Sequence, residues 1–500
     1  MNSIIKAVPN VKKFNDYIFE IKKGTNPMML SGLTDVAKIH MAYSTKFYAD
    51  KPICIITYNE MQAKKMIKDL AFFGEKVRFF PKRDVISFDY VAESKDVLFK
   101  RISVLNQLVK NEKNIIVTTI EAAMQKMITK ENLYRNVIKL KVGDALNLEE
   151  LKEKLILLGY ERYDLIEGKG QFSVRGGIID IATSATNGVR IEFWGDEIDS
   201  IRNFSLATQR TISMLDDIEI YPSYEFLLDD DINTVCARIE DKSYPNSVKE
   251  KVKEDIYQMK NGDFVTKIDK YFDCFYKNTD TFLDYLPKDC IVFIDEISKV
   301  KARAENITKD NTRLIKDLVE KNKIVPGILT EMKDYLKFSE SLESKQTVYL
   351  EKQDMGFIDK QSMHAKRNGY SFSYREVNFF RSSMDLLFQE LQEATKRGKQ
   401  TVILGGSTEN CKKLSNLLLE KNIKNVYTDI LEDEITLGVV NITPGAFSAR
   451  FWILWCKPIS YLNWWIIWGK TKKKNENSNS IQRRRESCIW RLKRRRFYCS

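Results

Sequence analysis

The sequence has few of the residues that build metal centres and catalytic triads. Its 500 residues include two histidines, His40 and His364, which lie far apart. None of the eight cysteines forms a Cys-x-x-Cys pair, which argues against a zinc ribbon or a dithiol redox motif. Scattered single cysteines are typical of a reducing compartment. We therefore expect a cytoplasmic protein with no metal site and no Ser-His-Asp triad.

Long apolar runs are also missing from most of the chain. The first residues, MNSIIKAVPNVKKFND, lack the apolar core of a signal peptide. No stretch before residue 450 approaches the ~20 apolar residues of a membrane span. The length suggests about three to four domains. We expect no membrane partner.

Positive charge is unevenly distributed. Residues 450–500 carry 14 of the 81 lysines and arginines but two of the 69 acidic residues, so they hold the whole net charge of +12. The same segment contains six of the seven tryptophans. A tail of this kind could bind nucleic acid through phosphate contacts and base stacking, or anchor at a membrane surface. A third interpretation is translation out of frame.

We favour the out-of-frame interpretation, because the composition changes abruptly inside a segment that otherwise reads as folded. The break is expected after about Ser448. Residues 450–500 are then expected to form an aberrant, disordered tail.

Strand and helix signals alternate along the rest of the chain. Residues 1 to about 130 alternate apolar strands with amphipathic helices, which predicts a parallel sheet covered by helices. Residues 137–222 contain one helix, 147–158, and short strands separated by turns, which predicts an α+β unit. A second small α/β pattern begins at Gly398, after a polar stretch near residues 345–385 that reads as a linker.

The segment SGLTDVAKIH, residues 31–40, resembles a damaged phosphate loop of the form GxTGxGKT. Gly32 and Lys38 remain, whereas Asp35 and Ala37 replace the inner glycines and Ile39 replaces the hydroxyl residue. A working loop needs those glycines to wrap the phosphates and the hydroxyl to bind Mg²⁺. The acidic motif FIDEIS, residues 293–298, also departs from a helicase pattern. We therefore interpret Gly32 and Lys38 as vestigial and expect no catalytic residue and no bound cofactor.

Three residues between 168 and 194 are candidates for binding a partner. Side chains alternate between the faces of a strand, so Arg190 and Trp194 share one face, and Arg175 joins them if its strand pairs with theirs. Arginines beside an exposed aromatic residue are typical of interaction hot spots. Alternatively, the arginines pair with Asp180 or Glu192 on a solvated sheet face.

The phrases GQFSVRGGIIDI, VRIEFWGDEIDSIRNF and TQRTI, all within residues 170–212, resemble the bacterial transcription-repair coupling factors. The resemblance extends to about Phe447 and includes FSYREVNFF and GVVNITPGAFS. This module is shared with the repair protein UvrB, which docks onto UvrA through it. The resemblance implies that Arg175, Arg190 and Trp194 bind UvrA, although the family usually has phenylalanine at the tryptophan position.

The resemblance also implies an architecture: an α/β, multidomain chain with a degenerate helicase-like lobe, an inserted α+β UvrA-binding domain and a small C-terminal α/β domain. The expected ranges are 1–136 and 223–355 for the lobe, 137–222 for the inserted domain, 356–389 for a linker, 390–449 for the small domain and 450–500 for the tail.

The implied function is recruitment of UvrA to stalled transcription complexes in nucleotide excision repair. RNA polymerase and DNA are expected to bind through regions that this sequence lacks. The ATP and Mg²⁺ of the family's motor are likewise expected to bind to a region that it lacks. The alternative is an ATP-dependent DNA translocase, if the chain continues in frame. The sequence leaves open whether this chain is an enzyme.

Overall fold

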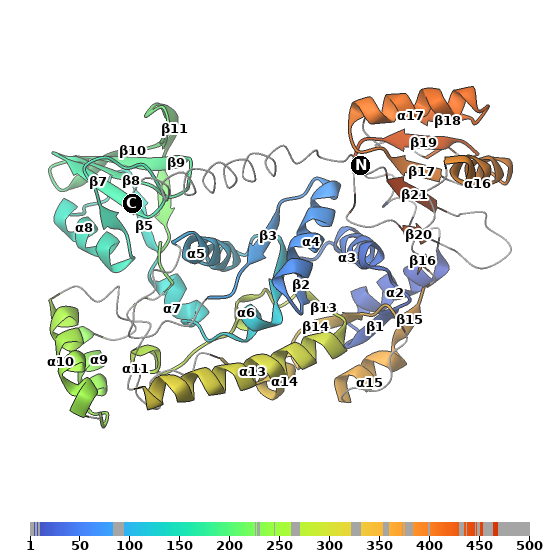
Figure 1. The fold of residues 1–500 in the computed structure, drawn as a ribbon. Coiled ribbons are helices and arrows are strands. Elements are labelled where there is room, and N and C mark those ends of the chain that lie inside the picture. Colours follow the sequence, from blue (N-terminus) through green and yellow to red (C-terminus); the bar gives the residue numbers. More distant parts are fainter. Residues whose placement is uncertain are drawn as a thin grey trace, which may run out of the picture. The chain divides into compact units, whose positions relative to one another are not determined.

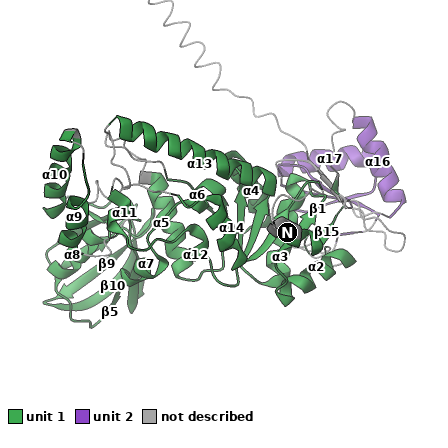
Figure 2. Cartoon of the chain, turned by 90° about the horizontal axis from the view of Figure 1, so that it is seen from below, with its two compact units in different colours: residues 1–376, 453–457 green, residues 377–452, 458–500 purple. Residues whose placement is uncertain are grey.

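The chain divides into two compact units (Figure 2), residues 1–376 with 453–457 and residues 377–452 with 458–500. The computed structural model describes residues 5, 8, 11–83, 95–225, 227, 231–244, 246–261, 271–321, 332–353, 360–372, 374–375, 384–398, 401–429, 435–436, 438–445, 447, 451–453 and 464–468.

A seven-stranded parallel sheet forms the centre of the first unit, in the order β15-β1-β14-β13-β2-β4-β3 (Figure 1). Its strands are β1 (Met28–Ser31), β2 (Ile53–Thr57), β3 (Val77–Phe80), β4 (Ile115–Thr119), β13 (Ile291–Asp295), β14 (Gln346–Leu350) and β15 (Gly369–Ser371). The central strands ICIIT, IIVTT and IVFID are buried along their whole length. Continuous β-branched runs of this kind are typical of a parallel sheet covered on both faces.

Helices between the strands cover this sheet, and several begin at a Thr or Asn whose side chain accepts an N–H of the first turn, as Thr34 does from Ala37. They are α2 (Lys12–Lys23), α3 (Asp35–Ala49), α4 (Glu60–Leu70), α5 (Lys95–Val109), α6 (Ile120–Met124), α7 (Lys130–Arg135), α12 (Phe282–Tyr285), α13 (Ile297–Glu320) and α14 (Tyr335–Glu343), with α15 (Lys360–Arg367) before β15. Further helices are α9 (Ile232–Glu240), α10 (Asn246–Lys260) and α11 (Phe272–Phe275), and a 3-10 turn spans Ala71–Phe73.

A second sheet is inserted between α7 and α9. Its order is β11-β10-β9-β8-β7-β6, from β6 (Glu161–Arg162), β7 (Gln171–Arg175), β8 (Ile178–Ile181), β9 (Asn187–Trp194), β10 (Glu197–Ser205) and β11 (Thr211–Leu215). A two-stranded ladder of β5 (Ile138–Lys141) and β12 (Asp217–Ile220) joins the insertion to the lobe. Helix α8 (Leu148–Leu157) buries Leu151 and Leu155 in the core that also contains the sheet residues Ile179 and Ile191.

A buried ion pair fastens this insertion to the lobe. Arg101 of α5 is fully buried and donates to both carboxylate oxygens of Glu225, at 2.6 and 2.7 Å. The same guanidinium donates to the Pro81 carbonyl at 2.7 Å and to Gln125 at 3.0 Å. Burial raises the pKa of Glu225, but the charge and hydrogen bonds of Arg101 outweigh burial, so the pKa is lowered. The first residues after the insertion are therefore tied to the ends of β3 and α6.

The predicted lobe boundary at residue 355 is too early. Strand β15 pairs with β1, and Phe372 N–H donates to Ser31 at 2.9 Å, so residues 369–372 belong to the lobe sheet. Part of the predicted linker, 356–389, is therefore folded: α15, β15 and the start of α16 (Met384–Lys396) lie within it. The short polar run at residues 369–371 did not indicate an edge strand, because its partner strand, β1, lies more than 300 residues away in the sequence.

The second unit is a small α/β domain. Strands β17 (Thr401–Leu404), β18 (Asn425–Tyr427) and β19 (Val440–Thr443) form parallel pairs, and α17 (Thr408–Glu420) lies between β17 and β18 in the sequence. Strand β21 (Trp464–Trp468) pairs with β17 on its other edge. The remaining short strands are β16 (Tyr374–Arg375), whose residues belong to the first unit, and β20 (Phe451–Ile453).

The expectation of a disordered tail does not hold for residues 451–453 and 464–468, which form β20 and β21. The rest of residues 450–500, with the predicted frame break after Ser448, lies outside the described residues. Within the described part of the chain, no helix is long and apolar enough to span a membrane.

Glu225→Ala should lower the free energy of unfolding by about 3–5 kcal/mol, because it leaves the buried Arg101 charge uncompensated. Glu131→Ala is the control, since its pair with Arg135 is exposed on both sides and should contribute about 0–1 kcal/mol. Urea unfolding followed by circular dichroism checks both variants. Equal midpoints for the two would contradict the anchoring role of Glu225.

Candidate functional site

The vestigial phosphate loop follows β1 and leads into α3. Gly32 adopts φ +76°, and a Cβ placed there would lie 1.8 Å from the carbonyl oxygen of Phe372. Tyr374 N–H also donates to the Gly32 carbonyl at 3.2 Å. The backbone of Phe372 and Tyr374 therefore packs directly against the glycine at which this loop begins.

Lys38 lies one turn into α3, is fully buried, and forms ion pairs with Asp295, the last residue of β13, and with Glu296, which follows it. Its Nζ donates to Asp295 Oδ1 at 2.7 Å and also contacts Glu296 Oε1. Asp295 Oδ2 accepts a further hydrogen bond from Thr57 at 2.8 Å. Burial lowers the pKa of Lys38, but the charges of the two carboxylates outweigh burial and raise it.

Two more carboxylates lie around this cluster. Asp35 pairs with Lys65 at 2.5 Å and Lys352 at 2.8 Å, and these contacts outweigh its burial and lower its pKa to about 2. Glu351 is fully buried, and Oε1 accepts the Ile297 N–H at 2.9 Å. Its Oε2 has no hydrogen-bond partner among the described residues, and burial raises the pKa of Glu351 to about 7.

The residues of this loop do not fit a nucleotide. Gly32 and Lys38 lie at the same sheet edge, as the motif predicts, but the space beside Gly32 is filled by backbone and the lysine charge is neutralised within the protein. The aspartate at Asp35 adds negative charge where phosphates would lie. These contacts support the interpretation of the loop as vestigial. That interpretation stays a prediction.

The register of the inserted sheet shows how the three predicted partner-binding residues are arranged. Cross-strand pairs place Arg175, Ile178 and Glu192 in one row. Arg190, two residues before Glu192, lies in the next row on the same face, between Asp180 and Arg202. Strand β8 separates β7 from β9, so the direct pairing considered for the strands of Arg175 and Arg190 does not occur. All three predicted residues nevertheless belong to the same sheet face.

Arg190 makes the ion pair that the alternative interpretation described. Its Nε and Nη2 donate to the two oxygens of Asp180 at 2.6 and 2.8 Å. The guanidinium also lies over the Phe204 ring, 4.7 Å from the centroid. These hydrogen bonds raise the pKa of Arg190. Its side chain is 23% exposed, so a partner could reach it mainly at the edge of the guanidinium.

Arg175 and Trp194 are more accessible. Arg175 is exposed at the end of β7 and donates one hydrogen bond to the Asp164 carbonyl at 3.1 Å. Trp194, beside the β9–β10 turn, is 84% exposed. An aromatic side chain of this size loses much water-exposed apolar area when a partner covers it. Of the three predicted residues, Arg175 and Trp194 are therefore exposed, whereas Arg190 is held by Asp180.

Sequence reasoning missed the edge of this surface. Met214 of β11 pairs across from Arg202 and is 63% exposed, so the face continues as far as the edge strand. The alternation in TISML could have indicated it, but whether β11 sits at an edge depends on strand order.

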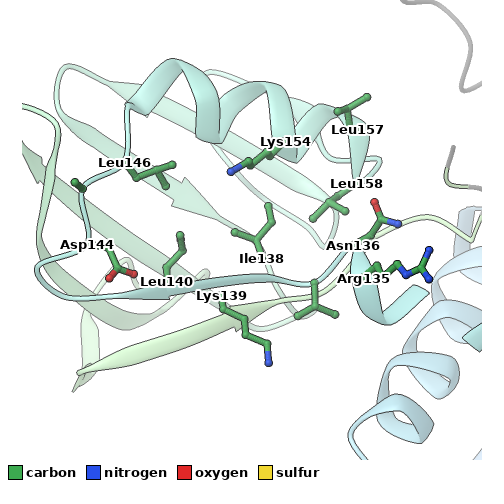
Figure 3. Close-up of a pocket in the computed structure, with 12 residues that line it drawn as sticks. Arg135, Asn136, Ile138, Lys139, Leu140, Asp144, Leu146, Lys154, Leu157 and Leu158 are labelled. Atoms are coloured by element: carbon green, nitrogen blue, oxygen red, sulfur yellow. The ribbon is translucent and has the colours of Figure 1, made fainter. Parts of the chain in front are cut away.

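A cavity of about 490 Å³ lies elsewhere in the inserted domain, between β5 and α8 (Figure 3). Apolar side chains of Ile138, Leu146 and Leu158 line it, with Lys154 and Asp144 at its borders. None of the three predicted partner-binding residues lines this cavity. The candidate site is therefore an open sheet face and not a pocket.

Comparison with known proteins identifies the inserted domain. Residues 138–226 match the family described as the UvrB interaction domain. Over 471 residues, or 90% of the chain, the sequence is 28% identical to the transcription-repair-coupling factor of Bacillus subtilis. The corresponding protein of Staphylococcus aureus strain MRSA252 is 24% identical over 85% of the chain. The chain spans 39% and 37% of the lengths of these two relatives.

Gly32→Ala should open the contact between β1 and residues 369–374. The new methyl group overlaps the Phe372 carbonyl and should cost about 1–3 kcal/mol, beyond the about 1–2 kcal/mol for a left-handed alanine. Gly24→Ala is the matched control, since Gly24 has φ +88° and nothing within 4 Å of a Cβ. Hydrogen exchange at Phe372 and Tyr374 should accelerate in the first variant alone. Unchanged exchange there would disprove the close packing.

Glu351→Gln should change how stability depends on pH. The folded pKa of about 7 lies above the ordinary value of 4.5. Between these values the folded state binds the extra proton, so Glu351 makes stability fall as pH rises. The unfolding free energy of the variant minus that of the parent chain should become more positive from pH 4.5 to 7 and then level off. Parallel urea midpoints across this range would show that Glu351 titrates normally.

Proposed function

Because the chain is homologous to the transcription-repair-coupling factors and contains a UvrB interaction domain, we propose that it recruits UvrA to stalled transcription complexes in nucleotide excision repair. The observation that carries this proposal is the sheet face around Trp194 and Arg175 within that domain. An exposed tryptophan beside arginines can supply both apolar burial and charged hydrogen bonds to a partner.

The proposed contact assigns different roles to the three residues. Trp194 supplies apolar area, and Arg175 offers donors beyond its single bond to Asp164. Arg190 is held by Asp180, which fixes its orientation before the partner arrives. A guanidinium that is already ordered loses less conformational entropy on binding than a free one.

We also propose that the lobe serves as a scaffold and works without a nucleotide, since Lys38 is neutralised by Asp295 and Glu296. The alternative, an ATP-dependent DNA translocase, would require a motor outside the two fifths of the relatives that this chain matches. RNA polymerase and DNA are likewise proposed as partners of those other regions. No contact among the described residues favours the translocase for this chain.

UvrA binding tests the proposal. Trp194→Ala and Arg175→Glu should each weaken UvrA binding by about 30-fold, the effect expected of a hot-spot residue. Arg397→Glu, an exposed arginine of the other unit, is the control and should leave binding unchanged. Titration calorimetry with purified UvrA measures all three.

The double variant Arg175→Glu/Arg190→Glu should abolish binding. Because Arg190→Glu places a second carboxylate beside Asp180, its melting temperature is compared with that of the parent chain. The single variants Trp194→Ala and Arg175→Glu avoid that repulsion. Full UvrA affinity in both single variants would refute this assignment of the site.

A further inference from the structure

A second cavity lies at the amino ends of the lobe strands, at the edge opposite the vestigial phosphate loop. It has a volume of about 610 Å³. Pro52 and Lys345 line it and directly precede β2 and β14, and Asp289 lines it two residues before β13. The registers Ile291↔Gln346 and Ile291↔Ile53 place these three strand starts side by side. The cavity is therefore built on the rigid sheet.

Lysines dominate the charge of this cavity. Lys113, Lys130, Lys288 and Lys345 line it, against Asp284 and Asp289. Lys113 is already paired with Asp50 at 3.0 Å. Asp284 accepts two hydrogen bonds from Thr281, at 2.7 and 2.8 Å, in the capping box of α12. The other three lysines therefore leave the cavity positively charged.

Two of these lysines are held next to each other. Lys130 Nζ donates to the Tyr285 carbonyl at 2.9 Å, and Lys345 Nζ donates to the Leu286 carbonyl at 3.0 Å. These carbonyls belong to consecutive residues at the end of α12. Each ammonium group has three N–H donors, so neither is saturated by its carbonyl. The lysine at position 345 is only 9% exposed, and Lys130 is partly buried.

Placing two lysine ammonium groups side by side where little water reaches them is electrostatically unfavourable. Burial, and then the charge of Lys345, lowers the pKa of Lys130. Burial likewise lowers the pKa of Lys345. An anion placed between them would offset both effects and use the remaining donors. The carbonyls carry no charge, and the nearby carboxylates of Asp280 and Asp284 offset the burial of the two lysines only in part.

We propose that this cavity binds a phosphate group, held by Lys130 and Lys345 with Lys288 at the rim. Phosphate offers several charged acceptor oxygens to ammonium donors that converge on one point. The group can belong to a small phosphate compound or to a nucleic-acid backbone. The site is separate from the proposed UvrA face and from the vestigial loop at Lys38.

Pyrophosphate and a short DNA duplex are the two probes, each titrated into the full chain by calorimetry. Lys130→Gln and Lys288→Glu should each weaken binding of the recognised probe by about tenfold or more, as expected for loss of a charged hydrogen bond or reversal of a rim charge. Lys253→Glu, an exposed lysine on α10, is the control and should not change affinity.

Each outcome decides the proposal. Saturable pyrophosphate binding that the two variants weaken supports a small phosphate ligand. Duplex binding that the variants weaken, without pyrophosphate binding, supports a nucleic-acid backbone. Absence of binding by both probes, or binding that the control weakens equally, overturns the proposal. Lys288→Glu removes no described hydrogen bond. If Lys130→Gln folds poorly, Lys288→Glu alone still tests the proposal.

Discussion

The buried pair between Arg101 and Glu225 is the constraint on which the arrangement of the first unit depends. It joins a helix of the lobe to the segment that leaves the inserted domain. Neither charge can be exposed to water without opening the core, and neither can be buried alone without a large penalty. The inserted sheet is therefore attached by a contact that requires the lobe to be folded.

The parallel sheet was predictable because each buried strand carries its own signal. Runs such as ICIIT and IVFID are apolar throughout, and helix-forming segments separate them. Strand β15 was not predictable in the same way. Its three residues, GYS, are short and partly polar, and they become a strand only because β1 offers a free edge. Local pattern cannot reveal a pairing created by a distant partner.

The candidate face was predictable in part. Alternation within β9 correctly places Arg190 and Trp194 on one face. The position of Arg175 relative to them depends on strand order, which no local pattern contains, and β8 lies between. The sequence offered Asp180 as a possible partner of Arg190, but it could not decide between a paired and an unpaired arginine. Asp180 faces Arg190 only because β8 and β9 pair in one particular register, and a shift by one residue would turn that carboxylate to the other side.

The buried cations of the lobe fall into two groups. Lys38 and Arg101 are neutralised inside the protein by carboxylates at hydrogen-bonding distance, so both stabilise the fold and are closed to ligands. The ammonium groups of Lys130 and Lys345 donate only to neutral carbonyls in the hydrogen bonds described, and the charges of Asp280 and Asp284 offset their burial only in part. A cation whose charge is only partly compensated keeps electrostatic attraction for an anion from outside. By this criterion, the carboxyl-end edge of the lobe sheet holds a lysine that is neutralised within the protein, whereas the amino-end edge of the same sheet keeps cationic side chains.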